Sequence, residues 1–199
     1  MTSMPLLLET DRLALRHFTA ADARHLHALD NDPEVMRYIN GSLPVALEVV
    51  ETRLLPTFLE YDERRPAFGF FAAVDRADGA FLGWVSLRPT RGDAGELELG
   101  YRFRRAAWGR GYATEAASAL VARAFADPTV LRVFATTYED NVASRRVMEK
   151  LGLTLRRTFR PTPEAIAGSD TSVEAGGEPW PGDDVEYALD RAEWEAFRS

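Results

Sequence analysis

Two glycines, Gly109 and Gly111, stand in the stretch AAWGRGYATEAA at residues 106–117, directly before a segment with helical periodicity. Glycine adopts positive φ angles without strain and allows a ligand to approach the backbone closely. The pair therefore predicts either a tight turn into a helix or a binding loop at the helix N-terminus. The apolar residues that follow recur at the spacing of one helix face: Ala113, Ala116, Ala117, Leu120, Val121, Ala124 and Phe125.

Two familiar nucleotide-binding loops do not fit this stretch. A P-loop places Lys and then Ser or Thr after its last glycine, whereas Tyr112 follows Gly111. The dinucleotide fingerprint requires glycine or alanine where this chain has Thr114. What remains is a set of backbone amides at the positive end of a helix dipole, with Arg104 and Arg110 nearby. The stretch thus predicts a site for a phosphorylated cofactor, with a ligand-free turn as the alternative.

The order of segments along the chain predicts a mixed α/β fold, one sheet with helices packed on its faces. Strands are expected at residues 6–16, 68–74, 81–87, 96–103, 130–138, 153–160 and 185–189. Helices are expected at residues 23–29, 33–39, 47–60, 113–125, 142–151 and 191–197. Proline cannot continue a regular helix, so Pro56 is expected to break or kink the third of them.

Length and composition limit the classes of function. A chain of 199 residues suits a single domain, residues 1–199, with a long loop at 161–184. The formal net charge of −7 argues against a nucleic-acid binder with a broad basic surface. The chain has no cysteine, and its three histidines have no ligand cluster beside them, so no metal site is expected. With no signal-like start and no membrane-length apolar run, we expect a cytoplasmic protein without a membrane partner.

Three motifs in order carry a resemblance to a known family. WGRGYATEA follows ELELGYRF, and NVASRRVMEKLGL comes about thirty residues later. Together they resemble the GNAT superfamily of acetyl-CoA-dependent N-acetyltransferases, especially the branch with the ribosomal-protein N-terminal acetyltransferases. ETDRLALRHFTAADA and DPEVMRYI resemble the opening of that branch, and the match is weakest at residues 41–67 and 161–184. The resemblance implies a mostly antiparallel sheet of about seven strands with helices on both faces, in the order β-α-α-β-β-β-α-β-α-β-β.

The resemblance also implies where acetyl-CoA binds. The family's diphosphate loop has the pattern Gln/Arg-x-x-Gly-x-Gly/Ala, in which Gly111 and Ala113 take the last two places and Trp108 departs from the first. The loop amides from Gly109 to Thr114 would hold the diphosphate, and the strand backbone at Tyr101 and Phe103 would pair with the pantetheine arm. The full set of expected cofactor-binding residues is Tyr101, Phe103, Arg104, Trp108, Gly109, Arg110, Gly111, Tyr112, Ala113, Thr114, Asn141 and Ser144.

Each side chain proposed for chemistry has a structural alternative. Glu98 matches a strand position used as general base elsewhere in the superfamily; otherwise it is a solvent-facing carboxylate of a sheet. Many relatives protonate the leaving thiolate with a tyrosine, but this chain has Met148 there, so Ser144 is the expected acid and Tyr138 the reserve. Asn141 would hold the cofactor arm, or simply cap the helix that follows it.

The resemblance leaves the acceptor open. Direct attack by a primary amine is expected, either a protein N-terminus or a small molecule, and a homodimer is compatible with the family. The loss of the tyrosine acid keeps a second hypothesis open, a non-catalytic acyl-CoA-binding relative. For residues 161–184 we expect a lid that Trp180 anchors and whose carboxylates attract a cationic amine, with a solvated acidic loop as the alternative.

Overall fold

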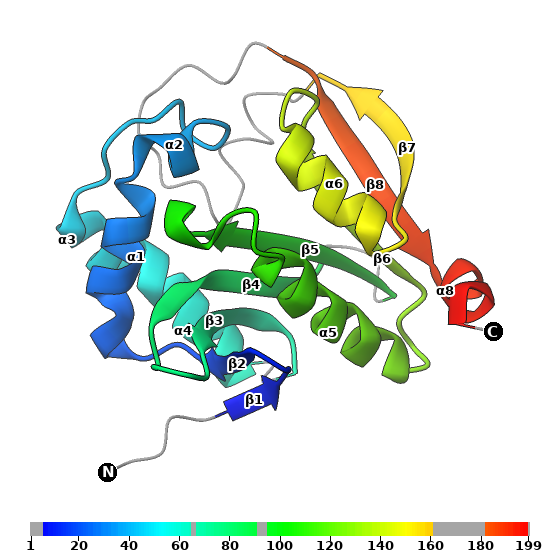
Figure 1. Cartoon of the computed structure of the whole chain (residues 1–199), viewed down its shortest axis with the longest axis horizontal. Coiled ribbons are helices and arrows are strands. Elements are labelled where there is room, and N and C mark those ends of the chain that lie inside the picture. The colour runs from blue at the N-terminus through cyan, green and yellow to red at the C-terminus, as the bar shows by residue number, and fades with distance from the viewer. Residues whose placement is uncertain (1–5, 65–66, 91–94, 161–181, 199) are drawn as a thin grey trace.

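The computed structural model describes residues 6–64, 67–90, 95–160 and 182–198 (Figure 1). Within these ranges eight strands form one sheet in the order β1-β2-β3-β4-β5-β6-β8-β7. Every neighbouring pair is antiparallel except β5 and β6, so the predicted mixed and mostly antiparallel sheet is confirmed. The strands are β1 (Leu6–Glu9), β2 (Leu13–His17), β3 (Gly69–Asp75), β4 (Phe81–Pro89), β5 (Glu96–Phe103), β6 (Arg132–Tyr138), β7 (Thr154–Phe159) and β8 (Asp184–Asp190).

The first predicted strand, residues 6–16, is wrong in one respect: it is two strands joined by a turn, which is why the sheet exceeds seven strands. Thr10 makes the turn, since its backbone N–H donates to the Leu13 carbonyl at 2.8 Å. Its hydroxyl oxygen in turn accepts from the Leu13 N–H at 3.0 Å. Residues 9–12 contain neither glycine nor proline, so the sequence carries no ordinary turn signal at this point.

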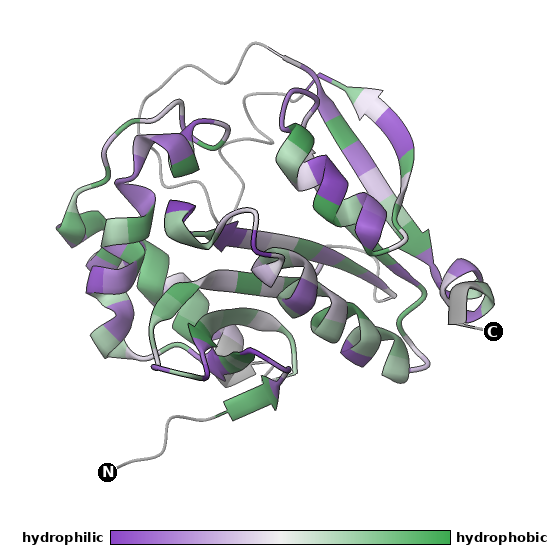
Figure 2. Cartoon of the chain, in the orientation of Figure 1, coloured by the Kyte–Doolittle hydropathy of each residue, from purple (hydrophilic) through white to green (hydrophobic). Residues whose placement is uncertain are grey.

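Helices cover both faces of the sheet, as predicted. The helices are α1 (Ala23–Asp30), α2 (Pro33–Met36), α3 (Leu47–Val49), α4 (Leu55–Arg64), α5 (Tyr112–Ala126), α6 (Val142–Lys150) and α8 (Arg191–Arg198). One core joins α5 and α6 to one sheet face, and a second core joins the N-terminal helices to the other. Strands β3 and β4 lie between these layers and are mostly apolar (Figure 2).

The interruption predicted at Pro56 occurs one turn earlier and does not end the helix. Residues Val50–Leu54 form a π-helical turn between α3 and α4, and Pro56 is the second residue of α4. A proline ring clashes with the carbonyl four residues before it in a regular helix, and the wider π turn relieves that clash.

The long loop lies mostly outside the described residues. Of residues 161–184 the structure describes only 182–184, so the proposed lid with its Trp180 anchor is not among them. Asp184, which we expected in the loop, is instead the first residue of β8, where it pairs with Tyr138 and Phe159. In the described part of the chain, no helix combines the length and the apolar character that a membrane crossing requires.

Candidate active site

Strands β5 and β6 separate partway along their length. They pair in parallel only at Glu96, Leu97 and Glu98, although β5 continues to Phe103. Meanwhile β6 pairs with β8 over its whole length. In Figure 1, β5 and β8 lie close at the α8 end and diverge towards α2. The divergence exposes the edge of β5 that faces β6.

The hydrogen bonds at the two ends of β5 show which backbone groups line this edge. The Gly95 carbonyl accepts from Leu131 N–H on the β6 side, whereas Arg104 N–H donates to Leu82 on the β4 side. Since successive residues of a strand point their backbone groups to opposite edges, Tyr101 and Phe103 point theirs towards the gap. These are the two positions expected to pair with pantetheine.

Trp108 closes one part of this edge. Its indole Nε1 donates to the Phe103 carbonyl at 2.7 Å, while the residue as a whole is 47% exposed. The contact ties the loop before α5 to the end of β5. Trp108 stands where the family pattern has Gln or Arg, and its part in cofactor binding stays a prediction.

Both loop glycines have positive φ angles, +70° at Gly109 and +80° at Gly111. A Cβ at Gly109 would meet no described atom within 4 Å, and one at Gly111 would meet only Arg12 Nη2, at 3.5 Å. Backbone conformation therefore demands these glycines, and the space around them stays open. The first helical hydrogen bond links Glu115 N–H to the Gly111 carbonyl at 3.0 Å, which leaves the preceding amides without helical partners.

A hydrogen-bonded cluster bridges the gap between β5 and α6. The Tyr101 hydroxyl lies 3.0 Å from the Ser144 Oγ and donates to the Ser144 carbonyl at 3.0 Å. Burial raises the pKa of the Tyr101 phenol, more than its hydrogen bond with Ser144 lowers it. The phenol therefore remains protonated at neutral pH and available as a donor.

Asn141 takes part in the same cluster as the N-cap of α6. Its side-chain oxygen accepts from Ser144 N–H at 3.2 Å, and its Nδ2 donates to Thr137 Oγ1 at 3.0 Å. The structural alternative is thus present, and a contact with the cofactor arm stays a prediction. Met148, which stands where many relatives have the tyrosine acid, is a core residue and is 1% exposed.

The Glu98 side chain lies on the face of β5 opposite to that of Tyr101. Glu98 belongs to the last residue pair between β5 and β6 before these two strands diverge. Its carboxylate forms an ion pair with Arg88 at 2.7 Å; the glutamate side chain is 33% exposed and the arginine 8%. Sequence reasoning missed Arg88. The antiparallel register of β4 and β5, which places Arg88 directly opposite Glu98, is the signal that could have found it.

A carboxylate with an unusual titration, Asp184, lies near Tyr138. Asp184 pairs with Tyr138 in the β6–β8 ladder. Burial, together with the charge of Asp183, raises the pKa of Asp184 to about 6. A carboxyl group that titrates this close to neutrality is a candidate for acid–base chemistry.

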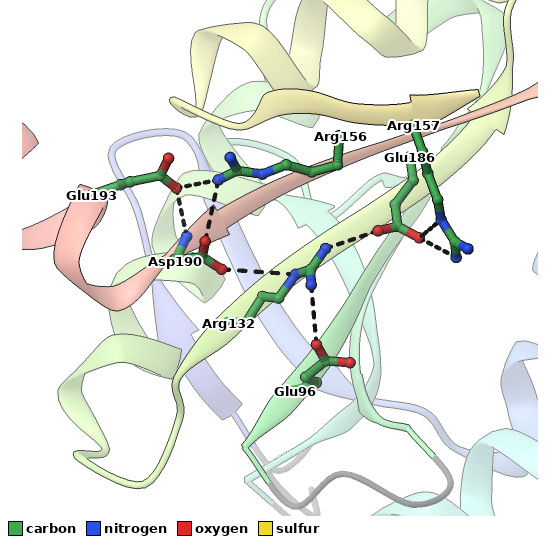
Figure 3. Close-up of polar contacts among 7 residues, drawn as sticks. All are labelled: Glu96, Arg132, Arg156, Arg157, Glu186, Asp190 and Glu193. Carbon is green, nitrogen blue, oxygen red and sulfur yellow. Dashed lines mark hydrogen bonds and ion pairs between the residues drawn. The ribbon is translucent and has the colours of Figure 1, made fainter.

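An ionic network joins β5, β6, β8 and β7 near the end at which β5 and β6 are paired (Figure 3). Arg132 contacts Glu96 at 3.3 Å and Glu186 at 2.8 Å, and Arg157 contacts Glu186 at 2.6 Å. Some of these residues line a cavity of about 390 Å³. The arginines are matched by carboxylates, so the cavity does not present a free anion site. Among the described residues, no cluster of histidine and carboxylate side chains could hold a metal ion.

Comparisons with known proteins agree with this geometry. The acetyltransferase (GNAT) domain model matches residues 12–154. The Bacillus subtilis (strain 168) protein YkkB is 33% identical over 162 residues, 80% of this chain and 92% of that protein. The FsC-acetyl coenzyme A-N(2)-transacetylase of Aspergillus fumigatus is 31% identical over 201 residues, 94% of this chain and 77% of that enzyme.

A solved structure shows the same fold at lower identity. The ribosomal L7/L12 alpha-N-protein acetyltransferase RimL, in complex with coenzyme A, superposes with a TM-score of 0.72 at 15% identity. The superposition covers 93% of this chain and 97% of that one. Since the family model spans well over half of the chain, the protein belongs to the GNAT family of acetyltransferases, for which acetyl-CoA is the cosubstrate.

Proposed function

We propose that this acetyltransferase transfers the acetyl group to a primary amine, a protein N-terminus or a small molecule, by direct attack on the thioester. The observation that carries the proposal is the divergence of β5 from β6 after Glu98. It opens a strand edge at Tyr101 that leads towards the free amides at the start of α5. The pantetheine arm would pair with that edge as an added strand, and the diphosphate would lie on the loop amides.

The proposed chemistry divides between the two faces of β5. Glu98 accepts the proton of the attacking amine, and the Tyr101 backbone amide stabilises the oxyanion that forms on the thioester carbonyl. When the carbon–sulfur bond breaks, the Ser144 hydroxyl donates its proton to the thiolate. Tyr101 supports the proposal for Ser144, because its phenol lies 3.0 Å from the serine oxygen and orients that side chain. Tyr138 remains the reserve acid.

The buried Met148 favours one alternative function. A methionine cannot donate a proton, so a relative that binds acyl-CoA without catalysis would also tolerate it. The two functions differ in a single measurement, the acceptor-dependent release of free CoA thiol. A panel of N-terminal peptides, polyamines, amino acids and aminoglycosides is the appropriate acceptor set. Release with any of them supports the transferase; CoA binding without release from the whole panel supports the binding protein.

Acetyl-CoA is expected to stabilise the protein against unfolding. A ligand that binds only the folded state adds about 2.7 kcal/mol at a hundredfold excess over its Kd. Thermal unfolding with increasing acetyl-CoA, and separately with CoA, measures this stabilisation. A melting temperature that does not respond to either compound at any concentration would overturn the proposed use of the site.

Replacing Ser144 with alanine should lower kcat by about a hundredfold or more, since a positioned acid is lost. The Kd for CoA should change much less, because the serine backbone contacts and the Asn141 cap remain. Single-turnover rates and CoA titrations on the same preparation separate the two effects. Tyr101→Phe is the matched variant, since it removes only the partner hydroxyl. Equal losses of kcat and CoA affinity in Ser144→Ala would make Ser144 a cofactor contact and not the acid.

A further inference from the structure

We propose that the turn between β1 and β2 belongs to the cofactor site, with Arg12 as a positioning residue that sets the diphosphate-binding loop. This inference rests on the proposed function of that loop. Residues 10–12 and Glu115 come from motifs about a hundred residues apart, and neither has a role in the chemistry above.

Glu115, at the start of α5, binds the turn between β1 and β2 through its carboxylate. Its Oε1 accepts from the Thr10 hydroxyl at 2.5 Å and from the Arg12 backbone N–H at 2.9 Å. Its Oε2 accepts from Arg12 Nε at 2.7 Å and forms an ion pair with Arg12 Nη2 at 2.6 Å. A carboxylate held by four donors fixes α5 against the turn with little freedom.

Arg12 also contacts the loop itself. Its Nη1 donates to the Arg110 carbonyl at 2.9 Å, and its guanidinium lies over the Tyr112 ring, 4.4 Å from the centroid. The tyrosine hydroxyl is anchored in turn to Asp75 at 3.1 Å. Because a peptide unit is planar and trans, a fixed Arg110 carbonyl also fixes the direction of the Gly111 N–H. That N–H is one of the amides proposed to bind the diphosphate.

The charge of Arg12 has a second effect at the same place. An acidic residue in the first turn stabilises a helix, but its negative charge would repel a diphosphate bound at the same helix end. Arg12 neutralises Glu115 directly. Removal of Arg12 would therefore release the loop and leave an unbalanced carboxylate beside the phosphate groups.

The test compares the CoA affinity of two variants, one at Arg12 within the β1–β2 turn and one at Arg76, which contacts the same turn. Arg12→Ala removes the contacts to the loop. Arg76→Ala is the matched control, because Arg76 donates to the Thr10 carbonyl at 2.7 Å but has no contact with the loop. The two side chains are similarly exposed, 46% for Arg12 and 42% for Arg76. We expect Arg12→Ala to raise the Kd for CoA about tenfold and Arg76→Ala to raise it less than about twofold.

A truncated donor separates positioning from general damage. S-acetylpantetheine lacks the diphosphate, so Arg12→Ala should use it as well as the wild type does, with an unchanged KM for the acceptor. Glu115→Gln added to Arg12→Ala should restore part of the lost CoA affinity, since it removes the unbalanced charge.

Equal losses of CoA affinity in the Arg12 and Arg76 variants would overturn the inference, because they would show only a weakened hairpin. A loss with S-acetylpantetheine equal to that with acetyl-CoA would also overturn it. Failure of the proposed function is distinguishable, since the wild-type protein itself would then bind no CoA.

Discussion

Replacing Gly111 with aspartate is expected to weaken CoA binding by about a hundredfold or more while the protein stays folded. The new Cβ has room, because the nearest described atom, Arg12 Nη2, is 3.5 Å away. The φ of +80° costs a non-glycine residue about 1–3 kcal/mol, and aspartate tolerates this conformation better than most. Its negative charge also suits a helix N-terminus in the absence of ligand. What the carboxylate cannot do is share that helix end with a diphosphate.

The chain offers a matched control for the backbone strain. Gly79, in the turn between β3 and β4, has a φ of +73° and no described atom within 4 Å of its Cβ position. Gly79→Asp should lower the melting temperature by a similar amount and leave the CoA response intact. Gly111→Ala, with strain but no charge, should lie between the wild type and Gly111→Asp in affinity. Normal CoA binding by a folded Gly111→Asp protein would show that the loop is only a turn.

The sequence predicted the turn at Gly109 and Gly111 and the helix that follows it, because their determinants are local. Two glycines, a helix with one apolar face and a helix N-terminus all lie within about twenty residues, and the structure places α5 at Tyr112–Ala126. The divergence of β5 from β6 has no such local signal. Alternation across residues 96–103 predicts a strand but does not show where its pairing with another strand stops. Only the resemblance to the family, which implies that the backbone at Tyr101 and Phe103 pairs with pantetheine, pointed to an open strand edge there.

The contacts of Glu115, which the sequence did not predict, join distant segments of the chain. Thr10 and Arg12 meet Glu115 only because β2 lies beneath α5, and a local pattern cannot show which polar residue a helix will meet. The Arg88–Glu98 pair was more accessible, since adjacent antiparallel strands in a meander fix their own register. The β1–β2 turn was missed because Thr10 supplies the turn hydrogen bond with its side chain and needs no glycine or proline.

Replacing Glu98 with glutamine is expected to lower kcat/KM for the acceptor by about a hundredfold or more at pH 7. An aliphatic amine is mostly protonated there, and glutamine cannot accept its proton. The deficit should shrink as the pH rises towards the pKa of the amine, because the free amine then forms without a base. CoA affinity should not change, since Glu98 lies on the face of β5 away from Tyr101. Glu98→Asp, which keeps the negative charge near Arg88 but shortens the reach of the carboxylate, should lower kcat/KM as well.

Asp184 is the alternative candidate for the general base, and a variant at this residue tests the role proposed for Glu98. Its pKa of about 6 gives it the titration of a general base, yet it lies on β8 and pairs with Tyr138. Because folding raises the pKa of Asp184 to about 6, its ionisation lowers stability as the pH rises from the ordinary carboxyl range to about 6, and the loss persists at higher pH. Asp184→Asn should therefore raise the melting temperature at pH 8. That shift verifies the variant independently of catalysis. If Glu98 is the base, Asp184→Asn keeps the pH dependence of kcat/KM that the wild type shows. If Asp184→Asn abolishes that dependence while Glu98→Gln remains fully active, the base is Asp184.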